Sequence, residues 1–509
     1  MSVILDGNHL TIEEVIRVSR GRENVSLSDF SVKAVNKSRS YVEKKLDEGA
    51  LIYGLTTGFG KFSDTIVKNG DARALQKNLI LSHACGMGEP FKEETARAIL
   101  LLRINALSKG FSGIRLSTIE GLIAMLNKGV TPVIPMKGSL GASGDLALLA
   151  HMVLPLLGLG EVYYKGERVS GAIATKDAGI KTIELESKEG LALINGTQAL
   201  CAVGTLALYD TWNLARIADI VAAMSAEALL GITKAFDKKI HEARGIKGQI
   251  DVAMNLRNIL KGSKLAKETN PDKVQDAYSI RCTPQIHGGT REALVYIQNL
   301  VNSEINAATD NPLIFADEDE VISGGNFHGQ PLAIAFDTLG IAASELANVS
   351  ERRIERLVNP SLNEGLPAFL TRHGGLNSGF MIAQYSAASM VSENKIYAHP
   401  ASVDSIPSSA NQEDHVSMGS TAAQKAAKIV ENTRRVLGIE LFSVCQALDL
   451  RGEENLSPAT RKVYDCVRRA GVPFVEEDIL MAPEMKKCEE LLMDDTIIKA
   501  AESVCGKLL

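Results

Sequence analysis

Apolar residues recur at spacings of three and four along most of the chain, which is the periodicity of amphipathic helices. The first of these helices has a capping-box start, because Glu14 follows Thr11 by three positions and an apolar pattern comes next. The same periodicity predicts further helices at 31–48, 72–85, 92–109 and 117–127. Helical periodicity therefore dominates the N-terminal part of the chain.

Three longer runs of this periodicity predict the long helices of a bundle, at 200–230, 332–357 and 422–450. Strand alternation is sparse, and one hairpin is predicted at 161–169 around Lys165-Gly166. We therefore expect a mainly α fold with few short strands. It would consist of a smaller, loop-rich N-terminal domain over 1–200 and a central long-helix bundle with a C-terminal helical region over 201–509.

Composition narrows the protein class. The 509 residues are 45% hydrophobic and 23% charged, as in soluble globular proteins, and the net charge of -6 comes without a basic stripe that nucleic acid would require. Seven cysteines form no CxxC pair, which fits a reducing compartment. The start of the chain lacks a secretion signal, and Leu146–Gly160 is too short to span a membrane. We expect a cytoplasmic protein that binds neither membrane nor nucleic acid.

Several common site motifs do not fit. The segment 54–60 contains a GxG without the full dinucleotide spacing, and no Walker A sequence occurs. His241-Glu242 does not continue into HExxH, and no two histidines are four residues apart, so we expect no metal site. The segment 141–145 lacks one glycine of the GxSxG elbow, which argues against a hydrolase serine.

Ala142-Ser143-Gly144 allows two interpretations. In the first, Ser143 or Asp145 caps the apolar helix that follows. In the second, a compressed turn lets the unhindered Gly144 nitrogen attack the Ala142 carbonyl. Loss of water from that ring and from Ser143 would then leave an electrophilic methylidene-imidazolone made from the backbone itself.

The segment 138–147 (GSLGASGDLA) resembles the signature of the aromatic amino acid ammonia-lyases, which make this methylidene-imidazolone group. Other stretches resemble the site segments of that family in the same order, and they lie at 53–60, 195–198, 275–282, 324–328 and 405–415. The resemblance implies a methylidene-imidazolone cofactor formed autocatalytically from Ala142-Ser143-Gly144, with no external cofactor. Leu148, Ala277 and His287 depart from the family pattern, and none of them replaces a group needed for chemistry.

Substrate choice in this family is associated with the residues after the helix at 79–81. Here they are Ser82-His83, as in the branch that acts on histidine, and Glu413 offers a carboxylate that pairs with an imidazole but not with a phenyl ring. The resemblance implies conversion of L-histidine to trans-urocanate and ammonia, the first step of histidine degradation. The alternatives are an ammonia-lyase or aminomutase acting on another aromatic amino acid, or a catalytically silent helical scaffold.

The family match also implies roles for individual residues. Tyr53 is the candidate base, and a neighbouring positive charge or donor must depress its pKa. Tyr278 would share the proton transfer or donate to the cofactor oxygen, and Asp145 would assist ring closure or only cap the next helix. The remaining side chains would bind substrate or flank the cofactor: His83 and Glu413 at the imidazole, Arg281 at the carboxylate, Asn195 and Gln275 as neutral hydrogen-bond partners, and Phe327 as an apolar wall.

The resemblance further implies a homotetramer with dihedral symmetry, in which each site draws loops from three subunits. Such sharing would explain why the site segments are scattered from position 53 to position 415 while the long helices are so apolar. The residues themselves also allow a monomer with a large internal bundle.

Overall fold

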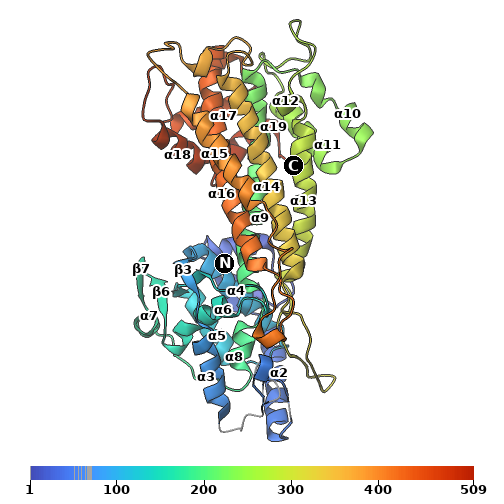
Figure 1. The fold of residues 1–509 in the computed structure, drawn as a ribbon, viewed down its shortest axis with the longest axis vertical. Coiled ribbons are helices and arrows are strands. Elements are labelled where there is room, and N and C mark those ends of the chain that lie inside the picture. Colours follow the sequence, from blue (N-terminus) through green and yellow to red (C-terminus); the bar gives the residue numbers. More distant parts are fainter. Residues whose placement is uncertain (1, 51, 55–56, 59, 63–64, 66–70) are drawn as a thin grey trace. The chain divides into compact units, whose positions relative to one another are not determined.

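The computed structural model describes residues 2–50, 52–54, 57–58, 60–62, 65 and 71–509. It separates into two compact units. The first comprises Met1–Leu206, Gln298–Asp337 and Pro400–Gln424, and the second Ala207–Ile297, Thr338–His399 and Lys425–Leu509. Helices dominate both units, which confirms the mainly α fold with few short strands (Figure 1).

The first unit contains short helices and most of the strands. Its helices are α1 (Ile12–Ser19), α2 (Asp29–Asp47), α3 (Ala72–His83), α4 (Glu93–Ser108), α5 (Leu116–Asn127), α6 (Leu146–Val153), α7 (Gly171–Asp177) and α8 (Glu189–Ile194). Its strands are β1 (Ser2–Leu5), β2 (Asn24–Leu27), β3 (Met87–Pro90), β4 (Thr131–Pro132), β5 (Pro135–Lys137), β6 (Glu161–Tyr164), β7 (Glu167–Ser170), β8 (Leu313–Phe315) and β9 (Glu320–Ile322). The pairs are β1 with β2 in parallel, and β3 with β5, β4 with β6, β6 with β7 and β8 with β9 in antiparallel.

Helix α4 is the core of this unit. Every residue from Ala96 to Ser108 is buried, and α1, α2, α5 and α6 pack around the helix. Two arginines, Arg97 and Arg103, lie within this apolar helix and are themselves buried. Burial of a guanidinium is tolerated only where its donors find acceptors, so both residues must hold specific partners in place.

Local signals in the sequence correspond closely to the observed elements. Thr11 and Glu14 form the capping box of α1 with both reciprocal hydrogen bonds. The predicted hairpin is present as β6 and β7, and Lys165 and Gly166 both have the positive φ that a tight two-residue turn needs. These predictions are confirmed because capping and turn geometry depend on a few neighbouring residues.

Four long helices are α9 (Gln198–Ala228), α13 (Thr283–Glu304), α14 (Gln330–Val358) and α16 (Gly419–Arg451). Parts of all four belong to the second unit, together with α10 (Lys238–Arg244), α11 (Lys247–Ile259), α12 (Tyr278–Arg281), α15 (Met381–Tyr397), α17 (Pro458–Arg469), α18 (Met481–Leu491) and α19 (Thr496–Cys505). The sequence pattern predicted α9, α14 and α16 and did not single out α13.

Buried polar groups connect the long helices inside the second unit. Glu440 of α16 pairs with Arg353 of α14 at 2.5 Å and accepts a hydrogen bond from Ser225 of α9 at 2.6 Å. Within the described residues, α14 alone is long and apolar enough to cross a membrane by length and composition. Its most apolar window is 67% buried, as in a core helix.

Candidate active site

The loop at 138–145 turns at two glycines, Gly141 and Gly144. Gly141 and Gly144 both have φ near +70°, a conformation that glycine adopts without steric cost. Gly144 lies against the backbone of Gly196, and a Cβ at position 144 would be 2.1 Å from the Gly196 oxygen. The close approach of these two backbones therefore requires glycine at position 144.

Asp145 follows this turn and is fully buried. Its carboxylate accepts hydrogen bonds from Ser139 Oγ at 2.8 Å and from the Leu200 amide at 2.7 Å. The interpretation of Asp145 as the side-chain cap of the helix that follows it is wrong, because it makes no such bond to α6 and instead caps the first turn of α9. Burial raises the pKa of this carboxyl to about 6 despite these donors.

Ser143 and Glu413 meet although 270 positions separate them. Ser143 Oγ donates to Glu413 Oε1 at 2.8 Å, and Ser408 Oγ donates to Glu413 Oε2 at 2.9 Å. The backbones of Ser408 and Glu413 are also paired, so a short turn fixes the carboxylate from behind. The reactive-loop serine thus faces a positioned negative charge.

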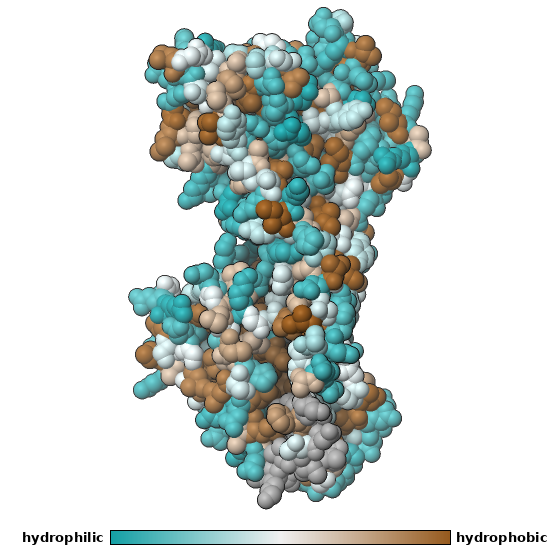
Figure 2. All heavy atoms as spheres, viewed as in Figure 1, coloured by the Kyte–Doolittle hydropathy of each residue, from teal (hydrophilic) through white to brown (hydrophobic). Residues whose placement is uncertain are grey.

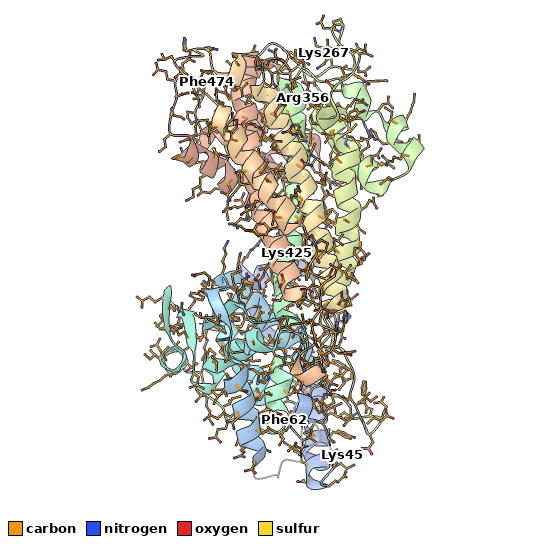
Figure 3. The ribbon with its side chains drawn as sticks, viewed as in Figure 1. Lys45, Phe62, Lys267, Arg356, Lys425 and Phe474 are labelled. Atoms are coloured by element: carbon orange, nitrogen blue, oxygen red, sulfur yellow. The ribbon has the colours of Figure 1, made fainter. Side chains whose placement is uncertain are left out.

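Ser143 and Glu413 line a cavity of about 760 Å³ in the first unit. Phe62, labelled in Figure 3, also lines this cavity and is 69% exposed, which places it at the opening. The candidate site residues that the structure brings together here are Tyr53, His83, Ser143, Asn195 and Glu413. A cavity of this size with a few polar groups in an otherwise apolar wall is typical of a small-molecule site.

The Tyr53 hydroxyl accepts a hydrogen bond from the Gly60 amide at 3.1 Å. Burial raises the pKa of Tyr53, the Gly60 donor lowers it, and the Glu413 carboxylate raises it, with a net increase above the ordinary value of 10.0. The first unit therefore supplies the expected donor, but the net effect favours the protonated phenol. Leu55, Thr56 and Phe59 of the same sequence motif lie outside the described residues.

His83 ends helix α3 beside Ser82. Ser82 Oγ donates to the Leu79 carbonyl at 3.2 Å and lies 3.0 Å from His83 Nδ1. When the Ser82 proton is on the Leu79 carbonyl, Nδ1 of His83 donates to Ser82 Oγ and Nε2 is an acceptor; the roles of the two ring nitrogens depend on this tautomer. Burial lowers the pKa of His83, the Leu79 carbonyl and Glu413 oppose this shift, and the net result favours the neutral ring.

The other candidate residues do not line this cavity. Phe327 lies in the first unit on the loop before α14. Gln275, Tyr278 and Arg281 belong to the second unit, where Arg281 lies 4.5 Å over the Tyr278 ring and donates to the Asp276 carbonyl. Tyr278 is 68% exposed, and its hydroxyl makes no hydrogen bond among the described residues.

Two groups that hold the site residues were not among those predicted from the sequence. Ser408 binds Glu413, and the Gly60 amide binds Tyr53. Ser408 precedes Glu413 by five positions in a serine-rich segment, which is a detectable signal for a local turn. A backbone amide such as that of Gly60 leaves no signal of this kind.

Comparison with known proteins gives a consistent result. A family model described as aromatic amino acid lyase matches residues 10–469. The chain is 55% identical over 500 residues to the histidine ammonia-lyase of Alkaliphilus oremlandii, covering 98% of each. The solved histidine ammonia-lyase of Trypanosoma cruzi matches with a TM-score of 0.92 at 42% identity, covering 99% of this chain and 96% of that one. Tyrosine aminomutase from Streptomyces globisporus matches with a TM-score of 0.94 at 38% identity over 99% of each chain. The chain therefore belongs to the aromatic amino acid lyase family.

Proposed function

We propose that this protein eliminates ammonia from L-histidine and forms trans-urocanate. The observation that carries this proposal is the contact between Ser143 and Glu413 in a cavity that His83 also lines. Two groups in this cavity can accept from an imidazole N–H, namely the Glu413 carboxylate and Nε2 of His83. A phenyl ring would leave both acceptors unpaired, which disfavours phenylalanine.

The electrophile would be made from Ala142, Ser143 and Gly144. The Gly144 nitrogen bonds to the Ala142 carbonyl carbon, and its proton moves to the carbonyl oxygen. That hydroxyl leaves with the Ser143 amide proton as water, giving a C=N bond in the ring. Ser143 then loses its hydroxyl and its Cα hydrogen as a second water, giving the exocyclic methylidene. Two waters are lost and no oxidant is needed.

The residues present fit such a ring. The Gly144 and Gly196 backbones are in close contact, which restrains the turn in which the attack would take place. Asn195 is buried, lines the same cavity, and its Oδ1 has no hydrogen-bond partner among the described residues. A buried amide without a partner is costly, and a polar group of the cofactor or substrate would satisfy it.

Once formed, this group supplies an electrophile that activates the substrate for loss of ammonia. The protein side chains then have separate tasks. Glu413 and His83 orient the imidazole, and Asn195 orients a polar group next to the ring. Tyr53 is the candidate to take the β-proton. Burial and the Glu413 carboxylate together raise the pKa of Tyr53, so this pKa must fall before the phenol can act as a base.

We propose that Arg281 and Tyr278 complete the site from neighbouring copies in a homotetramer. Arg281 would bind the substrate carboxylate and place a positive charge near Tyr53, while Gln275 would add a neutral hydrogen bond. The exposure of Tyr278 and Gln275 supports this proposal, since neither side chain makes a hydrogen bond among the described residues.

Exposed apolar side chains in the second unit give further support for assembly. Ile341 of α14 and Ile382, Tyr385 and Ile396 of α15 are 48%, 57%, 58% and 72% exposed. Figure 2 shows hydrophobic residues among hydrophilic ones on the visible face of the molecule. Burial of such residues between copies would remove apolar area from water and so favour association.

The direct test is the ultraviolet absorbance of product when the purified protein is mixed with L-histidine, with L-phenylalanine and L-tyrosine in parallel and no added cofactor. We expect product from L-histidine alone. Reaction with a different amino acid would refute the substrate assignment, and the similarity to a tyrosine aminomutase makes a β-amino acid product the outcome to check in that case.

A variant tests the proposed electrophile separately. Ser143→Ala removes the hydroxyl that leaves as the second water, so we expect turnover to fall by several orders of magnitude while the fold is unchanged. Intact-protein mass spectrometry should show the parent chain lighter than its sequence mass by two water molecules. Near-normal turnover in Ser143→Ala would refute the role of this residue.

A further inference from the structure

Arg103 contacts the Asn195–Gln198 segment and does not line the cavity. Its guanidinium is fully buried and donates to Gln198 Oε1 at 2.8 Å and to the carbonyls of Ala192 and Thr309. Ala192 precedes this segment and Gln198 follows Asn195 by three positions. One planar fork therefore binds both flanks of the segment that carries Asn195.

The guanidinium also packs directly against Gly196 in the middle of the segment. A Cβ at Gly196 would be 2.4 Å from Arg103 Nη1. From the other side, the Gly196 carbonyl accepts the Asp145 amide at 2.8 Å and is in close contact with Gly144. Gly196 is thus held between Arg103 and the loop that would close the ring.

The charge of Arg103 has no carboxylate of its own. No ion pair of Arg103 is present among the described residues, and Asp310, whose charge raises the pKa of Arg103, pairs with Lys188 at 2.8 Å. Burial lowers the pKa of Arg103 to about 10, so the guanidinium stays protonated at neutral pH. An unpaired cation in the core is costly, and the donors of this one are used on Gln198 and on the carbonyls of Ala192 and Thr309.

We propose that Arg103 is a positioning residue for formation of the cofactor, because it holds Gly196 against Gly144 in the turn in which ring closure would take place. This inference rests on the proposed ring formation from Ala142, Ser143 and Gly144. Attack of the Gly144 nitrogen on a carbonyl two residues away is slow unless the backbone is held close to the reacting geometry. Arg103 provides this restraint from a helix, which is more rigid than a loop.

The experiment compares Arg103→Lys with Arg97→Lys. Arg97 lies on the same helix, is also buried, and donates to the carbonyls of Val18, Ser19 and Leu126, none of which lines the cavity. Lysine keeps the charge but loses the planar fork in both variants, so the two changes cost the core a similar set of hydrogen bonds. The readout is the fraction of purified chain that is lighter by two water molecules, together with the urea midpoint of unfolding.

We expect the cyclised fraction to fall at least tenfold in Arg103→Lys and to stay at the parent level in Arg97→Lys. Equal cyclisation in the two variants would overturn the role of Arg103 while leaving the proposed function intact. A parent chain that has lost no water would instead overturn the proposed function. The two failures are therefore distinguishable.

A second variant decides the question if Arg103→Lys does not fold. Gln198→Met removes the side-chain acceptor of Arg103 and leaves its two backbone carbonyl contacts in place. Because part of the restraint remains, we expect a several-fold slower appearance of the two-water loss after refolding. Cyclisation at the parent rate would overturn the inference.

Discussion

Replacement of Asp145 by asparagine should make the protein more stable at neutral pH. Asp145 is fully buried, and the donors to its carboxylate are the Ser139 hydroxyl and the backbone amides of Leu200 and Ala199, none of which is a cation. Asparagine has nearly the same shape, its oxygen can accept from Leu200, and Ser139 can reverse its hydroxyl to accept from the new amide. The substitution therefore removes a buried charge and keeps these two contacts.

The magnitude follows from the pKa shift. Burial raises the pKa of Asp145 from 3.8 to about 6, and each pKa unit corresponds to about 1.4 kcal/mol. A raised pKa means that the folded state binds the proton more tightly than the unfolded state. Stability from this group is therefore full below the unfolded pKa and is lost as the pH rises through the folded pKa, to a total of about 3 kcal/mol at pH 7.5.

The assay is urea unfolding of Asp145→Asn and of the parent at pH 5 and pH 7.5, monitored by far-ultraviolet circular dichroism. Taking the difference between the two proteins cancels every other group that titrates. We expect an advantage for the variant of about 3 kcal/mol at pH 7.5 and about half of that at pH 5. A variant that is less stable than the parent at pH 7.5, or an advantage that does not grow with pH, would refute the reasoning.

Three further predictions concern the cavity. Gly144→Ala places a Cβ 2.1 Å from the Gly196 oxygen, so intact-protein mass spectrometry should show at least tenfold less cyclised chain. The control is Gly166→Ala, whose backbone has a similar positive φ but whose Cβ would meet no other atom, and it should cyclise normally. Glu413→Gln removes a charge-assisted hydrogen bond worth about 1.5–3 kcal/mol, so kcat/KM for histidine should fall roughly 10- to 150-fold at an unchanged urea midpoint; a loss below twofold would place Glu413 outside the substrate contacts. The pKa of His83 lies below 6.5, so lowering the pH protonates the ring and turns its Nε2 from an acceptor into a donor. We therefore expect kcat/KM of the parent to fall as the pH is lowered through the pKa of His83. This fall should be absent from the pH profile of His83→Gln.

Helices and turns that depend on neighbouring residues could be predicted from the sequence. The helix expected at 92–109 is observed as Glu93–Ser108, and the one expected at 72–85 as Ala72–His83. Periodicity and caps act over one or two turns, so these bounds are visible in the local pattern. The parallel pair of β1 and β2 could not be predicted in this way, because each strand has four residues and their pairing depends on partners 22 positions apart.

In the candidate site, too, residues in recognisable local segments could be predicted, whereas contacts with distant partners could not. Ser143 and Glu413 could be proposed together because each belongs to a recognisable segment. Arg103 could not, because an arginine in an apolar helix gives no indication of its acceptors, which lie 89 to 206 positions away. Asp145 was interpreted as a local cap, and the structure shows that its carboxylate binds the start of a different helix.

These two buried charges meet at one place, the first turn of α9. Asp145 accepts from the Leu200 amide, and Arg103 donates to the Gln198 side chain. Between them lies Gly196, whose carbonyl binds the Asp145 amide. Each charge costs stability when buried, and neither pairs with the other, so stability alone does not explain why both are present. Their common effect is to fix the backbone beside Gly144 from two sides, which is the restraint that ring closure needs. Apolar side chains could not supply it, because they form no directed contact with one peptide group.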